Sequence, residues 1–162
     1  MPLSSAKIRI DWFVRCAVGL VFTLNVSCAL AFILQPELYT AGFELEGRPG
    51  RVAVQAFGIL FLMWNATYPP VLFRPQSQQT LFGIILIQQL IGLVGETWLW
   101  LILPSEHQAL AATGLRFIIF DALGLVLMGI AFAWLHYETQ SSRLPHSPSE
   151  QANLTTRLRS PR

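Results

Sequence analysis

The sequence has little charge, and this shortage excludes two classes of protein. Asp, Glu, Lys and Arg together make up 12% of the 162 residues, about half of their share in a typical soluble domain. The Lys and Arg residues are not gathered into a stripe or patch of the kind that binds nucleic acid. We therefore predict neither a soluble globular domain nor a nucleic-acid-binding protein.

Cysteine and histidine are also scarce, and their positions argue against a disulfide framework or a metal centre. Cys16 and Cys28 lie in one apolar segment, where a helix would separate them by about 18 Å, too far for a disulfide. His107, His136 and His146 are scattered and show no spacing typical of metal or haem ligands. The sequence also lacks a phosphate-binding loop, a nucleophile elbow and zinc-binding motifs.

Long apolar segments dominate the sequence instead. Hydrophobic residues make up 53% of the chain, and four segments of about 20 residues cover residues 13–34, 52–73, 81–103 and 113–135. Because backbone polar groups in lipid must be paired within a helix or a closed barrel, continuously apolar segments predict helices. We predict an all-α integral membrane protein in which residues 1–137 form an antiparallel four-helix bundle. Residues 138–162, rich in Ser, Pro, Gln and Arg, are predicted to be a disordered cytoplasmic tail.

The distribution of basic residues predicts the orientation in the membrane. Arg48, Arg51 and Arg116 fall on one side, and the other side carries Lys7, Arg9, Arg15, Arg74, Arg143, Arg157, Arg159 and Arg162. The side richer in basic residues faces the cytoplasm, so both termini are predicted to be cytoplasmic in a multi-pass cell-membrane protein. An alternative interpretation takes residues 1–31 as a signal peptide.

Aromatic residues occur near the predicted helix ends, as in the aromatic belts of membrane proteins. These residues are Trp12, Tyr39, Tyr68, Trp98, Trp100, Trp134 and Tyr137. The connection over residues 35–51, on the predicted outer side, is long for so small a bundle. It is either an ordinary surface loop or an interfacial lid.

Polar and small residues recur at steps of three or four within the apolar segments, which places them on one face of each helix. The stripes are Val18, Phe22, Asn25 and Ala29; Gln55, Gly58, Leu62, Asn65 and Pro69; Gln88, Gly92, Gly95, Glu96 and Leu99; and Gly114, Phe117, Asp121, Gly124 and Met128. Such faces avoid lipid by packing against one another. We predict that they line the bundle interior, with Gln89 as a further interhelical amide.

Two acids within the apolar segments form the core of a candidate site. Glu96 and Asp121 are predicted to lie at nearly the same depth in the outer half of the membrane, where a lone carboxylate is costly. The full candidate ligand-binding cluster comprises Glu96, Asp121, Arg116, Arg51, Gln55, Gln88 and Asn65. One interpretation is a polar pocket that opens outward, and the other is a structural ion-pair network. A carboxyl group without an arginine partner would suit a proton-linked step or a hydrogen bond to a quinone carbonyl.

The layout resembles a known group of proteins. The four segments, the short link at Arg74-Pro75 and the sequence Pro36…Tyr39…Gly42 are similar to the DoxX-like small four-helix bacterial membrane proteins over about residues 10–137. The resemblance implies a location in the bacterial inner membrane and roles in quinone-linked redox chemistry or as subunits of larger membrane complexes. It assigns no role to any site residue.

Three functions follow from these observations. The first is a non-catalytic bundle that binds a small ligand in an outward-facing polar pocket, or an accessory subunit whose partners are other membrane subunits and the lipid bilayer. The alternative is a quinone-linked redox subunit that uses Glu96 and Asp121 as a carboxylate pair. The third is a small transporter. No resident metal or other cofactor is evident from the sequence.

Overall fold

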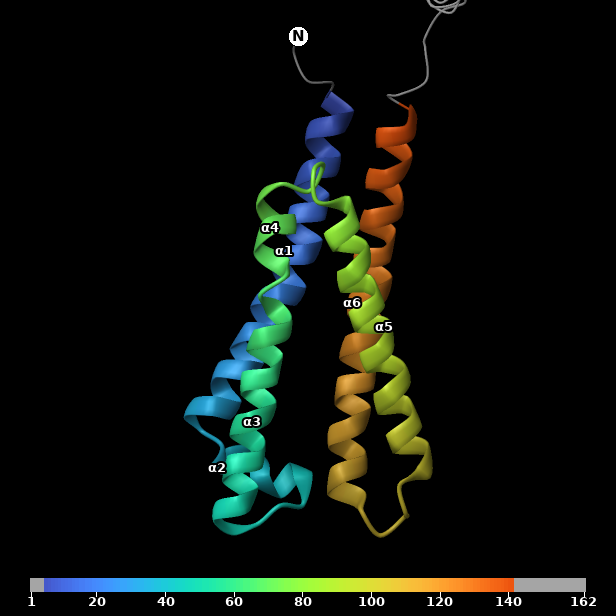
Figure 1. The fold of residues 1–162 in the computed structure, drawn as a ribbon. Coiled ribbons are helices and arrows are strands. Elements are labelled where there is room, and N and C mark those ends of the chain that lie inside the picture. The colour runs from blue at the N-terminus through green and yellow to red at the C-terminus, as the bar shows by residue number, and fades with distance from the viewer. Residues whose placement is uncertain (1–4, 142–162) are drawn as a thin grey trace, which may run out of the picture.

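The computed structural model describes residues 5–141, and within this range it is helical with no strands (Figure 1). The elements are α1 (Ser5–Leu34), α2 (Glu37–Thr40), the 3-10 turn η1 (Ala41–Phe43), α3 (Gly47–Asn65), α4 (Tyr68–Phe73), α5 (Gln79–Ile102) and α6 (Gln108–Ser141). The predicted all-α fold class is confirmed. Residues 138–141 continue α6 and are not part of a tail as predicted, and the remainder of the predicted tail lies outside the described residues.

Four stretches are long and apolar enough to cross a membrane: Ile8–Leu34, Gly47–Phe73, Gln79–Ile102 and Gln108–Ser141. They contain the predicted segments, apart from one residue at position 103. The helices extend beyond the apolar segments because polar residues in the flanking turns are compatible with helical geometry although they lower the hydropathy. Pro36 and Pro104 follow the ends of α1 and α5 closely, as expected of a residue that cannot donate the next helical hydrogen bond.

The second predicted span is interrupted between α3 and α4 by a turn at Ala66 and Thr67. Pro69 and Pro70 have no N–H to donate to the carbonyl groups of Asn65 and Ala66, so the helical ladder fails at this point. The span predicted over 52–73 lies within one apolar stretch, Gly47–Phe73, but this stretch consists of two helices.

Consecutive long helices run in opposite directions (Figure 1). α1 packs along α3 and α6, α5 packs along α6, and the short α4 contacts both α1 and α5. One end of the molecule carries α2, η1 and the turn between α5 and α6, and we call it the α2 end. The other, the terminal end, carries the start of α1, the connection between α4 and α5, and the end of α6 (Figure 1).

The tightly packed core is built by α1, α4, α5 and α6. Its fully buried members include Val14, Val18, Tyr68, Phe82, Ile85, Met128 and Leu135. On α5 and α6 these apolar residues lie on the terminal-end side of Gln89 and Asp121. The polar residues predicted to face the interior therefore lie between this core and the α2 end.

A close approach of α1 and α3 depends on Gly58. A Cβ atom at this position would lie 2.6 Å from the carbonyl oxygen of Ala29 and 2.8 Å from Cγ1 of Ile33. Both distances are far below van der Waals contact, so only glycine permits this spacing of the two helices. The prediction that Gly58 lies on the interior face of its helix is confirmed.

Candidate functional site

A polar cavity of about 290 Å³ lies among α1, α3, α5 and α6. Its polar lining consists of Asn25, Asn65, Gln89, Glu96, Arg116 and Asp121, and its apolar lining of Leu24, Cys28, Phe61, Trp64, Phe117 and Phe120. The structure thus brings together four residues of the predicted cluster: Asn65, Glu96, Arg116 and Asp121. Each of the four long apolar segments contributes at least one polar side chain.

The interior face of α5 runs through Ile85, Gln89, Gly92 and Glu96. Steps of four, three and four residues keep these positions on one side of a helix. Gly92 marks the contact with α6, because a Cβ atom there would lie 2.9 Å from Oδ2 of Asp121. Gln88, which was predicted to lie on this face, does not line the cavity. Neighbouring residues are offset by roughly 100° around a helix, and Gln89 occupies the interior position instead.

A hydrogen-bonded chain connects three helices beside the cavity. The Tyr68 hydroxyl of α4 donates to Oε1 of Gln89 over 3.3 Å, and Nε2 of Gln89 donates to Oδ1 of Asp121 over 2.8 Å. The side chain of Tyr68 is fully buried, so the prediction that it lies in an interfacial aromatic belt was wrong. A buried tyrosine hydroxyl needs an internal partner, and the amide of Gln89 supplies it.

Two acceptor oxygens at the cavity have no hydrogen-bond partner among the described residues. Asn65 is only 3% exposed, and its nitrogen donates to the carbonyl of Phe61 over 2.8 Å, but its Oδ1 accepts nothing. Oε2 of Glu96 is likewise buried and unpartnered. Unsatisfied buried acceptors are uncommon in proteins and require an explanation.

The two acids are not joined to an arginine. Arg51 pairs with Glu37, and His107 pairs with Glu44. Arg116 lines the cavity but is exposed, and it forms no ion pair with Glu96 or Asp121. The described geometry therefore does not contain the ion-pair network that was one interpretation of the sequence.

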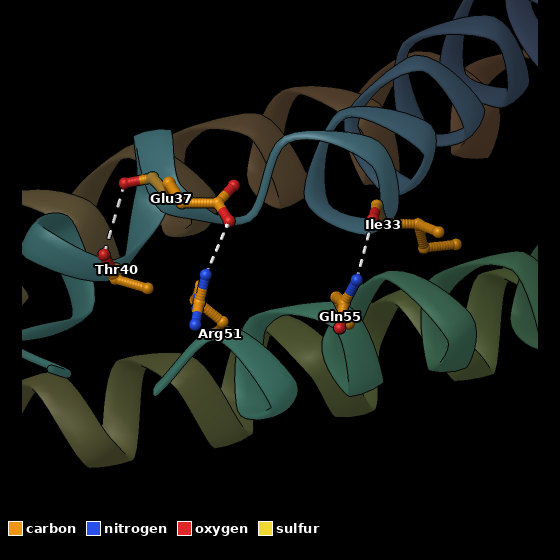
Figure 2. A network of polar contacts seen from close by, with 5 residues as sticks. All are labelled: Ile33, Glu37, Thr40, Arg51 and Gln55. Carbon is orange, nitrogen blue, oxygen red and sulfur yellow. Dashed lines mark hydrogen bonds and ion pairs between the residues drawn. The ribbon is translucent and has the colours of Figure 1, made fainter. Parts of the chain in front are cut away.

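Arg51 and Gln55 are not brought together with the two acids. Nε2 of Gln55 donates to the carbonyl of Ile33 over 3.1 Å, and Arg51 lies 3.3 Å from Oε1 of Glu37, whose own carbonyl accepts from Thr40 (Figure 2). Ile33 lies in the last turn of α1, where carbonyl groups lack helical partners. Both side chains thus fasten the end of α1 and the start of α2 to α3, beside a separate groove.

An apolar chamber of about 570 Å³ adjoins the polar cavity on the side of the α2 end. The two spaces share Phe61, Glu96 and Phe117 as lining residues. Phenylalanine rings form much of the chamber wall, namely Phe32, Phe43, Phe57, Phe61 and Phe117. The ring centroids of Phe43 and Phe57 lie 5.4 Å apart, and those of Phe61 and Phe117 lie 6.0 Å apart. Glu96 is thus a polar group at the junction of an apolar and a polar space.

The connection over residues 35–46 closes part of this chamber. It folds into α2 and η1, and Phe43 of η1 contributes a ring to the chamber wall. The next residue, Glu44, has a left-handed φ of 52° and is held to the start of α6. Its Oε2 lies 2.5 Å from Nδ1 of His107, and its Oε1 accepts the backbone N–H of Leu110 over 3.2 Å.

The contact between Glu44 and His107 alters the ionisation of both groups. The hydrogen bond with His107 lowers the pKa of Glu44, and the N–H of Leu110 lowers it further. The same hydrogen bond with Glu44 raises the pKa of His107. The ion pair therefore stabilises the attachment of this connection to α6.

Two site residues were missing from the candidate cluster. Tyr68 was predicted to lie in an aromatic belt, and Gln89 was predicted only as an interhelical amide. The apolar series Phe82, Ile85 and the glycine at position 92 could have identified the face that includes Gln89. No comparable signal exists for Tyr68, because its burial depends on the turn before α4.

Comparisons of the chain with protein-family models, with curated proteins and with solved structures found no match. The geometry of the site is therefore the basis for assigning a function. Residues 5–141 contain no group of three or more His, Cys, Asp or Glu side chains placed to hold a metal ion. The polar cavity and its apolar chamber suit an organic molecule with one polar and one apolar part.

Proposed function

We propose that this chain is an integral membrane protein that crosses the bilayer four times, as a four-helix bundle, and binds a small amphipathic molecule without transforming it. The polar part of the ligand occupies the cavity around Asn65, Glu96 and Asp121, and the apolar part occupies the adjoining chamber. Both termini face the cytoplasm, so the α2 end faces outward. The resemblance to DoxX-like proteins concerns only the membrane location and the four-helix layout of this proposal.

Membrane insertion is supported by the outer faces of the helices. On α5, Ile91, Val94 and Trp98 are each at least 60% exposed, and all four long helices carry similar large apolar side chains on their surfaces. Water-soluble proteins rarely expose continuous apolar surface of this extent. Lipid around these faces accounts for their composition.

Ligand binding is supported above all by the unpartnered Oδ1 of Asn65 in the wall of the cavity. An amide oxygen that is removed from water and receives no hydrogen bond is destabilising by about 1–3 kcal/mol. A ligand or a water molecule that donates to this oxygen removes the penalty. The adjoining chamber has room for a larger molecule than water, and its aromatic lining favours an apolar group.

The membrane topology can be tested with single cysteines in a variant that lacks Cys16 and Cys28. Ser105 and Ser77 are both exposed and lie at the α2 end and the terminal end, respectively. A membrane-impermeant maleimide added to intact cells should label Ser105→Cys, and it should label Ser77→Cys only after permeabilisation. The reverse pattern would invert the orientation, and labelling of both in intact cells would contradict the four-span topology.

Ligand binding can be tested by native mass spectrometry of protein extracted in mild detergent. A bound small molecule should be lost in Gly92→Leu, because a side chain at position 92 would project toward Trp64 and Asp121 in the cavity wall. Gly95→Leu is the matched control, since no heavy atom lies within 4 Å of a Cβ atom at that position. Absence of any bound molecule from the unmodified protein, or equal retention in both variants, would contradict the proposal.

A quinone-linked redox subunit is a second candidate, supported by the presence of Glu96 and Asp121 in the wall of one cavity. Organic extraction of the purified protein followed by chromatography would test it. A stoichiometric quinone that is lost in the Glu96→Gln, Asp121→Asn double variant would favour redox chemistry. Co-purification of another membrane protein would instead support the accessory-subunit function.

A further inference from the structure

We infer that the head group of the ligand is a primary amine, so that the chain binds lipophilic ammonium compounds. This inference rests on the proposed function and specifies its ligand. The head group is predicted to donate N–H bonds to acceptor oxygens of the polar cavity, while the apolar body extends past Phe61 and Phe117 into the chamber.

The cavity offers unused hydrogen-bond acceptors. Oδ1 of Asn65 and Oε2 of Glu96 are buried without a donor, and these two oxygens belong to different helices, α3 and α5. Oδ2 of Asp121 lies against Gly92 of α5. A group that presents several N–H bonds in different directions can satisfy acceptors placed in this way, and an ammonium group has three such bonds.

Two of the amide groups that line the cavity donate their hydrogen bonds to the protein itself. The Gln89 nitrogen donates to Asp121, and the Asn65 nitrogen donates to the carbonyl of Phe61. Arg116 is exposed and contributes one positive charge against the two acids. A ligand that only accepts hydrogen bonds would therefore leave the acceptor oxygens of Asn65 and Glu96 unsatisfied.

The surrounding rings also favour a cation. Phe61, Trp64, Phe117 and Phe120 line the same cavity as the two acids. The negative faces of aromatic rings attract ammonium groups, and tryptophan does so most strongly. Carboxyl groups and aromatic rings together form a site that recognises positive charge, and the apolar chamber beyond Glu96 supplies space for a hydrocarbon group.

Three probes that share one body can test the charge and donor preference. They are 4-phenylbutylamine, 4-phenylbutanol and 4-phenylbutyrate, and Trp64 can report their binding after Trp12, Trp98, Trp100 and Trp134 are changed to phenylalanine. The protein should be placed in nanodiscs of zwitterionic lipid, so that the membrane surface does not concentrate a charged probe. Gly92→Leu in the same background gives the reference signal with the cavity wall altered, because its side chain would project toward Trp64 and Asp121.

We expect the amine to bind at least tenfold more tightly than the alcohol and the carboxylate to bind most weakly. Glu96→Gln should reduce the preference for amine over alcohol to below threefold while the alcohol still binds. This variant preserves the hydrogen bond between Gln89 and Asp121, so the packing of α5 on α6 is retained.

The possible failures of the two proposals are distinguishable. If the alcohol or the carboxylate binds as tightly as the amine, or if Glu96→Gln leaves the preference unchanged, the amine inference is wrong but ligand binding stands. Equal binding of the trimethylated amine would overturn the requirement for N–H donors. If no probe gives a signal above that of Gly92→Leu, and no molecule co-purifies with the protein, the proposed function itself fails.

Discussion

Nε2 of Gln89 lies 2.8 Å from Oδ1 of Asp121, and this hydrogen bond joins α5 to α6 at the edge of the polar cavity. The oxygen of the same amide accepts from Tyr68 of α4. Because an amide donates only through nitrogen and accepts only through oxygen, its two partners fix its orientation. The chain thereby holds the carboxyl group of Asp121 in one position beside the cavity.

Removal of the Tyr68 hydroxyl should destabilise the protein. Tyr68→Phe leaves Oε1 of Gln89 without its donor, and hydrogen bonds between membrane helices contribute about 0.6 kcal/mol on average and up to about 1.7 kcal/mol. We expect a loss in this range in the free energy of unfolding, measured by steric trapping in bicelles. Tyr137→Phe is the matched control, because Tyr137 is 71% exposed. If the two substitutions have equal effects, the hydrogen bonds from Tyr68 through Gln89 to Asp121 do not stabilise the fold.

The sequence was sufficient to predict the long apolar helices and about half of the site. The reason is that polar and small residues recur at steps of three or four within the apolar segments. Asn65, Glu96 and Asp121 lie inside long apolar segments, where a polar side chain has few alternatives to the protein interior. Their convergence could therefore be predicted. Arg51 and Gln55 lie near a helix end, where other polar groups are available, and Glu37 and the carbonyl of Ile33 bind them instead.

Features that depend on a single backbone irregularity could not be predicted in the same way. Hydropathy averages over a window and does not detect the two-residue turn at Ala66 and Thr67. This turn separates Tyr68 from the helical register of α3, so the position of its side chain does not follow from α3. The left-handed backbone of Glu44, and with it the contact with His107, likewise depends on the fold of the α2 end.

Introduction of a methyl group at Gly58 should separate α1 from α3. The new Cβ atom would lie 2.6 Å from the carbonyl oxygen of Ala29, and this atom belongs to the backbone, so the clash can be relieved only by movement of a helix. Overpacking of this kind destabilises a protein by about 1–3 kcal/mol. Gly58→Ala should lower the melting temperature in detergent, measured by the fluorescence of a thiol-reactive dye or by circular dichroism.

Gly83→Ala provides the matched control for this prediction, because no heavy atom lies within 4 Å of a Cβ atom at position 83. Alanine has a higher intrinsic helix propensity than glycine, so this variant should be at least as stable as the unmodified protein. If Gly83→Ala destabilises the protein as much as Gly58→Ala, the effect reflects helix flexibility and not the contact between α1 and α3.

Attachment of the α2 end to α6 should depend on pH. The pKa of His107 is raised from its ordinary value of 6.5 by Glu44 and, more weakly, by the charge of Glu106. The stabilisation that His107 gives to this attachment is therefore complete below pH 6.5. It is lost as the pH rises through the higher pKa that His107 has in the folded state. The pKa of Glu44 is lowered from 4.5, so its contribution is present above pH 4.5 and is lost as the pH falls through the lower folded-state value.

Because both His107 and Glu44 contribute fully only between about pH 4.5 and pH 6.5, the α2 end should be attached most strongly to α6 in this interval. A nitroxide label on Leu38→Cys, in a variant without Cys16 and Cys28, should be least mobile by electron paramagnetic resonance in this interval and more mobile at pH 9. His107→Gln should remove the change in mobility at high pH, because glutamine does not titrate. Leu38 projects into solvent and the pair itself is exposed, so high salt should weaken the same effect through screening. A mobility that rises equally with pH in His107→Gln would show that a group other than this pair controls the attachment.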